Sequence, residues 1–158
     1  MTKSSAKDRR VRHIMSRDVV SLRADDTVHE ALNQLVENRV SALPIVDKLN
    51  HCIGILSTTD LIDITRDVDQ DLMYAGELDT TSRRWLIERL IHTVGEEPLT
   101  SYMTENVALV YAEDSLSKAA REMVHNRVHH LPVIDEKERV VGIVSTMDIL
   151  AELAEFPD

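Results

Sequence analysis

An internal repeat constrains the fold of this chain more than any other feature of its sequence. Residues 15–63 align without a gap on residues 103–151, at a constant shift of 88 positions (103 − 15). The segment GILSTTD at 54–60 returns as GIVSTMD at 142–148. Because a unit this short buries little apolar surface by itself, two copies predict that each buries it against the other. Two related halves that face each other would also form two related clefts.

The composition restricts the class of protein. The 158 residues carry 18 basic and 28 acidic side chains, a net charge of −10, which argues against nucleic acid and anionic membrane surfaces as partners. No secretory signal or run of membrane-spanning length is present, and the single Cys52, inside an apolar stretch, is expected to be a core residue. We predict a soluble, cytoplasmic protein.

The first helix of each copy is marked by its start, its apolar face and its end. Thr27 and Glu30 have the spacing of a capping box, and Asp114-Ser115 is the corresponding start. Asn38 and Asn126 stand where the helices should end, since Asn tolerates the left-handed conformation of such an end. Helical spacing predicts one apolar face in each helix: Val28, Ala31, Leu32, Leu35 and Val36, and Leu116, Ala119, Ala120, Met123 and Val124.

Two strands and a second helix follow in each copy. The apolar runs at 45–46 and 52–56, and at 133–134 and 140–144, predict strands buried on both faces. Ser57 and Ser145 then suit the N-terminus of a helix. Each copy is therefore predicted to be a β-α-β-β-α unit.

The segment between the copies is not repeated. Its clearest element is a helix at 82–94, in which Trp85, Leu86, Leu90, Ile91 and Val94 are expected on one side. That side is predicted either to pack over the two halves or to dock a second subunit or partner. We divide the chain into a first repeat at 11–65, an inserted helical segment at 66–98 and a second repeat at 99–154.

Four segments recur in the same order in both copies, including Leu43-Pro44 with Leu131-Pro132 and the Gly-Ile-x-Ser-Thr-x-Asp segment. In this respect the chain resembles the cystathionine-β-synthase (CBS) domain pair, or Bateman module. The resemblance implies an α+β fold of two β-α-β-β-α CBS repeats packed as one pseudo-two-fold module. It also implies a regulatory, energy-sensing module that binds AMP, ADP, ATP or S-adenosylmethionine in the clefts between repeats, commonly as a homodimer.

The candidate ribose and phosphate contacts lie in the Gly-Ile-x-Ser-Thr-x-Asp segments. A carboxylate at a strand-to-helix junction can accept ribose hydroxyls, and a serine at a helix N-terminus can bind ribose or phosphate. Gly54 and Gly142 would leave room for a base. The alternative is that Ser and Asp merely cap the helix. The predicted residues are Ser57, Thr59, Asp60, Ser145 and Asp148, with Met147 departing from the hydroxyl at Thr59.

The copies differ most before the Leu-Pro step, where the first has Ser41-Ala42 and the second His129-His130. The resemblance implies phosphate contacts for both histidines, because a His-Arg pair meets phosphate here in the regulatory subunit of AMP-activated protein kinase, a family member. Histidine is only partly charged near neutrality, so such contacts would be weak and pH-dependent. One cleft would join Asp60 and Ser57 to His130, and the other Asp148 and Ser145 to His129.

A bound metal and a purely structural role are the alternatives for the two histidines. Adjacent side chains of an extended segment point to opposite sides, so His129 and His130 should not chelate one ion, and we expect no metal site. Both could instead be structural or face the surface. Candidate adenine walls, for which core packing is an equal explanation, are Ile45, Val46, Val133 and Ile134.

Function is predicted as non-enzymatic ligand sensing, with output to an unknown effector protein in trans or to a homodimer. The sequence has no Gly-rich phosphate loop and no nucleophile elbow, and no catalytic cofactor is expected. The alternative function is a ligand-independent dimerisation scaffold, in which a charge at Leu86 or Leu90 would destroy assembly.

Overall fold

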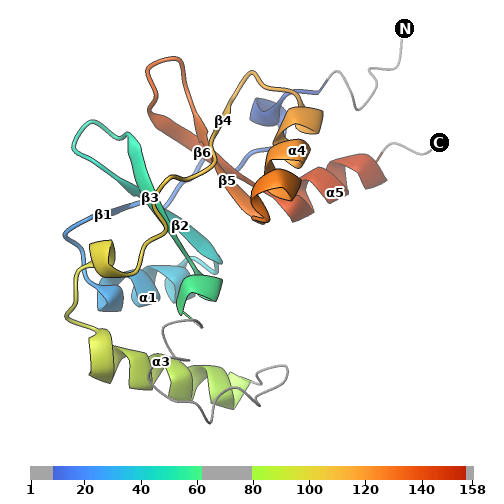
Figure 1. The fold of residues 1–158 in the computed structure, drawn as a ribbon. Helices are drawn as coiled ribbons and strands as arrows, with labels where there is room; N and C mark the ends of the chain where they lie inside the picture. Colours follow the sequence, from blue (N-terminus) through green and yellow to red (C-terminus); the bar gives the residue numbers. More distant parts are fainter. Residues whose placement is uncertain (1–8, 62–79, 156–158) are drawn as a thin grey trace, which may run out of the picture. The chain divides into compact units, whose positions relative to one another are not determined.

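Two three-stranded sheets form the framework of the protein in a computed structural model that describes residues 9–61 and 80–155. One has the order β1-β2-β3 and the other β4-β5-β6 (Figure 1). β1 pairs with β2, and β4 with β5, in parallel, whereas β5 and β6 are antiparallel. The predicted α+β fold of two repeats is confirmed. The strands are Leu22–Arg23, Ala42–Val46, Cys52–Ser57, Val110–Tyr111, His130–Ile134 and Val140–Ser145.

The helices follow the repeat as predicted. Residues 58–61 are helical, and the rest of the helix predicted there lies outside the described residues. Two 3-10 turns, η2 (Val11–His13) and η4 (Leu99–Ser101), open the two repeats. The described helices are α1 (Val28–Glu37), α3 (Thr80–Val94), α4 (Leu116–Asn126) and α5 (Thr146–Ala154).

The start of α1 is the predicted capping box. Thr27 Oγ1 accepts the backbone N–H of Glu30 at 3.2 Å, and Glu30 Oε2 accepts that of Thr27 at 2.7 Å. Ser115 Oγ caps α4 in the same way, accepting the N–H of Lys118 at 3.2 Å. These bonds satisfy N–H groups that have no partner within the helix.

Helices α1 and α4 end at Asn38 and Asn126 as predicted, but the left-handed residue at each end is the next one along the chain. Asn38 keeps a right-handed backbone, with φ −91°, because its side chain donates back to the carbonyl of Gln34 at 3.0 Å. The left-handed residue is Arg39, with φ 52°. In the second copy Asn126 makes the same side-chain bond to Glu122, and Arg127 is left-handed with φ 55°.

The described chain forms two compact units that do not coincide with the two repeats. Unit 1 comprises Met1–Val19, Lys48–Cys52 and Asn106–Asp158, and unit 2 comprises Val20–Asp47 and Ile53–Glu105. The segment that opens each repeat therefore packs with the other repeat. Val11 is fully buried in the core of unit 1, and Leu99 is fully buried in that of unit 2.

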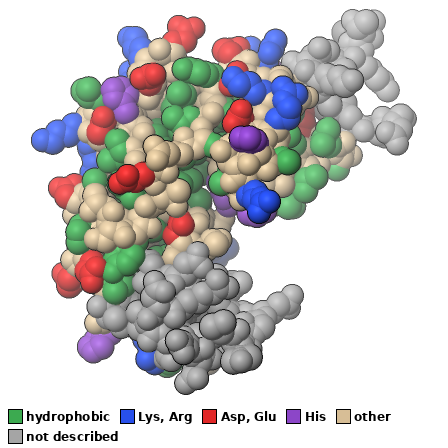
Figure 2. Space-filling model, viewed as in Figure 1, with side chains coloured by type: hydrophobic (Ala, Val, Ile, Leu, Met, Phe, Trp, Pro, Cys, Tyr) green, Lys and Arg blue, Asp and Glu red, His purple; other side chains and the backbone are tan. Residues whose placement is uncertain are grey.

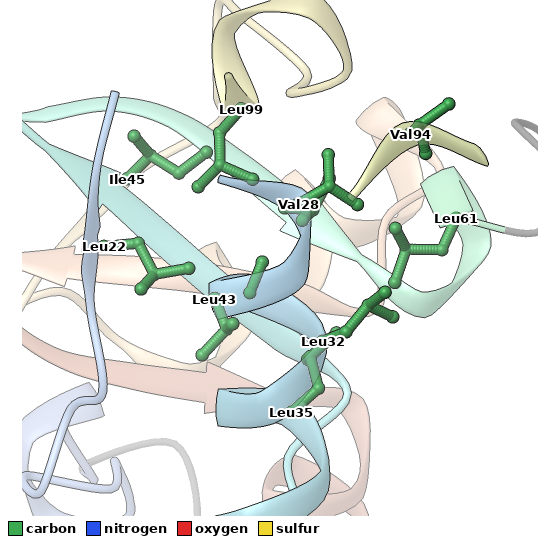
Figure 3. Close-up of a cluster of buried hydrophobic side chains, with 11 residues drawn as sticks. Leu22, Val28, Leu32, Leu35, Leu43, Ile45, Leu61, Val94 and Leu99 are labelled. Carbon is green, nitrogen blue, oxygen red and sulfur yellow. The ribbon is translucent and has the colours of Figure 1, made fainter. Parts of the chain in front are cut away.

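Each unit has its own apolar core, built from equivalent positions. Figure 3 shows that of unit 2, where side chains from α1, β2 and η4 converge. Val36 and Val124, which were predicted on the apolar faces of α1 and α4, lie outside these cores. They are 57% and 79% exposed. Burial on both faces holds for β2, whereas β6 alternates between buried and half-buried residues.

Gly54 and Gly142 each lie against a methionine that leaves no space for a side chain, and the approach of a base to these glycines stays a prediction. A Cβ on Gly54 would lie 2.6 Å from Met103 Sδ, and one on Gly142 would lie 2.5 Å from Met15 Sδ. Both methionines belong to the segments that open the repeats. We call these the exchanged segments, because each packs in the unit of the other repeat. The Met–Gly contact therefore helps to hold each exchanged segment in its unit.

Helix α3 contributes to the core of unit 2 through its C-terminal end. Val94 is buried there and Ile91 packs against the cluster. Trp85 was predicted on the same side, but it is 46% exposed and the guanidinium of Arg89 lies 5.2 Å from its ring centroid. The side chains of Leu86 and Leu90 lie outside the described residues. None of the helices described is both long and apolar enough to cross a membrane.

Candidate functional site: two serine–aspartate caps

Ser57 and Asp60 form a closed capping box where β3 ends in unit 2. Asp60 Oδ2 accepts the backbone N–H of Ser57 at 2.7 Å and its hydroxyl at 2.9 Å. Ser57 Oγ in turn accepts the N–H of Asp60 at 3.3 Å. The capping role that the sequence left open is therefore present, and it holds the carboxylate at the helix N-terminus.

The second oxygen of Asp60 also has a partner. Thr104 Oγ1, from the exchanged segment that opens the second repeat, donates to Asp60 Oδ1 at 3.1 Å. The backbone of Thr104 is fixed by two hydrogen bonds with Ile55, of 2.9 and 3.1 Å. Sequence reasoning missed Thr104, although the 88-residue shift relates it to another hydroxyl residue, Ser16.

Ser145 and Asp148 repeat the cap where β6 meets α5 in unit 1. Asp148 Oδ2 accepts the N–H and hydroxyl of Ser145 at 2.7 and 2.9 Å, and Ser145 Oγ accepts the N–H of Asp148 at 3.1 Å. Within the described part of the chain, Asp148 Oδ1 has no hydrogen-bond donor. This oxygen lies at the N-terminus of a nine-residue helix, whose dipole also favours anions.

In both units a backbone hydrogen bond joins the residue before the Leu-Pro strand to the start of the helix that follows the cap. The N–H of Thr146 donates to the carbonyl of His129 at 2.9 Å, and that of Thr58 donates to the carbonyl of Ser41 at 3.0 Å. The backbone of the two copies is thus alike where their side chains differ. The substitution of histidine changes the chemistry of one site on a common framework.

His130 lies beside the unit 1 cap. It is directly opposite Ser145 in the β5–β6 ladder and is half-buried. Burial lowers the pKa of His130 below its ordinary value of 6.5, and the nearby His129 lowers it further, while Asp148 acts in the opposite direction. His129 is exposed. Both histidines belong to unit 1 with Asp148, so the pairing of His130 with Asp60 stays a prediction.

The remaining predicted residues divide into surface and core positions. Thr59 is exposed and its counterpart Met147 is 69% exposed. The candidate adenine walls are at most 5% exposed, and core packing accounts for their positions, so the wall role stays a prediction. They are Ile45, Val46, Val133 and Ile134.

Charged side chains of both signs are interspersed over the described residues. Figure 2 shows acidic, basic and histidine side chains close together on the face drawn. No group of three or more His, Cys, Asp or Glu within residues 9–61 and 80–155 could hold a metal ion. The chemistry that the caps themselves offer is hydrogen bonding from hydroxyl donors to a fixed carboxylate.

Two sheets with a common order, two matching caps and two exchanged segments define an α+β protein built from a duplicated module. The family model of the CBS domain matches this chain twice, at residues 11–67 and 99–155. The chain belongs to the CBS domain family.

Proteins similar to this chain include both a curated relative and solved structures. The uncharacterised protein MJ1004 of Methanocaldococcus jannaschii is 27% identical over 153 residues, which cover 94% of this chain; the chain spans 59% of MJ1004. The CBS domain pair of MJ0100, solved with 5′-methylthioadenosine and S-adenosyl-L-methionine, is 22% identical with a TM-score of 0.68, covering 93% of this chain and 97% of that one. CBSX2 of Arabidopsis thaliana, solved with AMP, is 21% identical with a TM-score of 0.69, covering 92% and 96%.

Proposed function

We propose that this chain is a non-enzymatic regulatory module that binds an adenosine-containing ligand, namely AMP, ADP, ATP or S-adenosylmethionine. The observation that carries the proposal is the fixed carboxylate of Asp148, whose Oδ1 has no donor among the described residues. A ribose supplies hydroxyl donors for such an oxygen. The adenosine compounds bound by MJ0100 and CBSX2 support the same class of ligand.

The groups around Asp148 favour a ligand that carries less negative charge than ATP. The N-terminus of α5 attracts an anion, but His130 is held toward its neutral form by burial and so contributes little charge at neutral pH. Asp148 itself repels phosphate. These effects favour AMP or S-adenosylmethionine over ATP at the unit 1 cap.

A melting experiment on the whole chain tests the proposal. A ligand at about 100 times its dissociation constant adds roughly 2.7 kcal/mol to the free energy of unfolding. For a chain of this length that corresponds to a rise of roughly 5 to 10 °C in melting temperature. We expect this rise with AMP or S-adenosylmethionine and not with inorganic phosphate. No rise with AMP, ADP, ATP or S-adenosylmethionine would contradict the proposal.

The output of the module is proposed to pass through association with a second copy and, from there, to an effector protein in trans. Four large apolar side chains on the contacting helices α4 and α5 are exposed, which favours an association surface. They are Val124 at 79%, Met147 at 69%, Leu150 at 51% and Leu153 at 51%. The same surface supports the second candidate function, a scaffold that dimerises without a ligand.

A further inference from the structure

Residues 9–17 form a strongly basic segment in an acidic protein. They include four arginines and no acidic side chain, so the rest of the chain carries a net charge of −14 (−10 − 4). Arg10, Arg12 and Arg17 are exposed, whereas Arg9 is half-buried. We call the three exposed residues the arginine cluster. Positive charge is thus concentrated on one short part of unit 1.

The backbone that carries the cluster is fixed within unit 1. Val11, between two of the arginines, is fully buried and anchors the turn η2. The N–H of Arg12 donates to the carbonyl of Ala112 at 2.9 Å. η2 lies beside the start of α4 (Figure 1), where Arg10 forms a β-bridge with Ser115. A ligand can therefore bind these arginines without first ordering the segment that holds them.

One carboxylate of the chain already occupies the cluster. Arg12 Nη1 donates to Glu113 Oε1 at 2.6 Å, and Arg10 Nη1 donates to the backbone carbonyl of Glu113 at 3.3 Å. Arg17 Nη2 donates to the carbonyl of Arg12 at 3.1 Å, which brings the third guanidinium to the same place. The side chains of Arg12 and Glu113 are 46% and 61% exposed, so an incoming carboxylate can reach this ion pair.

The other acidic groups near the cluster do not neutralise it. Asp114 pairs with Lys118 at 2.9 Å, and the buried Glu152 pairs with Arg9 at 2.9 Å. Asp18 is exposed. With Asp18 and the resident carboxylate counted against the three arginines, the cluster remains positive.

The charge of the rest of the chain decides which anion fits the cluster. Guanidinium groups bind carboxylates and phosphates alike, through pairs of N–H donors. A nucleic acid is an extended polyanion, and it would have to cross a surface of net charge −14. A short acidic segment of a protein meets the cluster alone, because exposed charges more than about 8 Å away are largely screened at physiological ionic strength.

We propose that the arginine cluster docks an acidic segment of a partner protein. Carboxylates of that segment bind Arg10 and Arg17 directly and compete with Glu113 for the third arginine. The proposal rests on the proposed function only for the role of this partner as the effector, and the site itself does not depend on an adenosine ligand.

Fluorescence anisotropy of a labelled hexaglutamate peptide, titrated with the full chain, tests the docking site. We expect hexaglutamate to bind, hexaglutamine not to bind, and added salt to weaken the binding. An exposed ion pair changes affinity by roughly two- to fivefold, so Arg10→Gln and Arg17→Gln should each weaken binding by that factor. Arg121→Gln removes the same charge from an exposed position of α4 and should leave the affinity unchanged.

Glu113→Gln is the decisive variant, because its expected effect has the opposite sign. Loss of the resident carboxylate leaves Arg12 available to the peptide, so hexaglutamate should bind roughly two- to fivefold more tightly. Glu136→Gln removes the same charge from the exposed turn between β5 and β6 and should have no effect. Equal effects of the two substitutions would show that total charge alone drives binding, and would overturn the site.

The outcomes separate this inference from the proposed function. No binding of hexaglutamate overturns the inference, as does binding of a single-stranded oligothymidylate or of phosphatidylserine vesicles in its place. The proposed function then still stands on the titration with AMP. If hexaglutamate binds but AMP, ADP, ATP and S-adenosylmethionine do not, the proposed ligand function fails and the docking site stands. Unchanged melting temperatures of the variants show that each one folds.

Discussion

At the scale of single residues, His130 should make the stability of the protein depend on pH. Its pKa is below 6.5 in the folded protein, mainly because it is half-buried, with a further lowering by His129 against an opposing effect of Asp148. The unfolded chain therefore takes up a proton first as the pH falls. The contribution of His130 to the free energy of unfolding is fully present above about pH 6.5. It is lost as the pH falls from there through the lower pKa of the folded protein.

Urea unfolding between about pH 5 and about pH 8 measures this effect. We expect His130→Gln to reduce the slope of stability against pH in this window. His125→Gln, which removes an exposed histidine of α4, is the matched control. An unchanged slope in His130→Gln would show that other groups cause the dependence.

Also at the residue scale, the sequence predicted the two caps, whereas the ligand contacts stay predictions. The Ser-x-x-Asp spacing is local, and both Ser57 and Ser145 form the boxes that this spacing indicates. The bond between Thr104 and Asp60 joins residues 44 positions apart, so no local pattern predicts it. The left-handed Arg39 was missed because the side-chain bond of Asn38 to Gln34 competes with the usual helix end.

At the scale of elements, the Met–Gly contacts should couple each exchanged segment to the sheet it joins. A Cβ on Gly142 would lie 2.5 Å from Met15 Sδ and 3.0 Å from the carbonyl oxygen of Ser16. Overpacking of this kind costs about 1–3 kcal/mol, so Gly142→Ala should lower the free energy of unfolding by that amount.

A double-mutant cycle with Met15→Ala tests the origin of this cost. If the methionine causes it, Gly142→Ala should cost about 0.5–3 kcal/mol less in the Met15→Ala background than in the unmodified protein. Chemical denaturation of the four proteins gives the coupling. Strict additivity would mean that Met15 is not the source of the strain.

The order and type of the helices and strands followed from the periodicity of the sequence. Which segments make up each compact unit did not. The repeat indicates two equal halves, yet Val11 and Leu99 are buried in the unit of the opposite repeat. An exchange of short segments leaves the apolar periodicity unchanged, so the sequence carries no signal for it. Val36 and Val124 recur at helical spacing and are nevertheless exposed, because periodicity cannot show where a core ends.

At the scale of the whole molecule, the proposed self-association should depend on the exposed apolar side chains of unit 1. We expect Val124→Glu to shift the chain from dimer to monomer in analytical ultracentrifugation while its melting temperature stays close to that of the unmodified protein. Leu49→Glu, at a 68% exposed position between β2 and β3, is the matched control and should stay dimeric. A Val124→Glu protein that remains dimeric would exclude this surface.

The two candidate functions differ in how association responds to ligand. A sensor should change its association constant or its effector binding when AMP is added, because a ligand shifts an equilibrium only by its different affinity for the two states. A scaffold should associate equally with and without AMP. Ultracentrifugation at several AMP concentrations distinguishes them.

Calorimetric titration of AMP into three proteins tests whether a cap carboxylate binds the ligand: the unmodified chain, Asp148→Asn and Thr27→Ala. Thr27→Ala also loses a capping box, at the start of α1, and so controls for the loss of a helix cap. We predict that Asp148→Asn loses binding at the unit 1 cap and that Thr27→Ala keeps it. Undiminished binding by Asp148→Asn, or no heat of binding in any of the three, would show that this carboxylate does not bind the ligand.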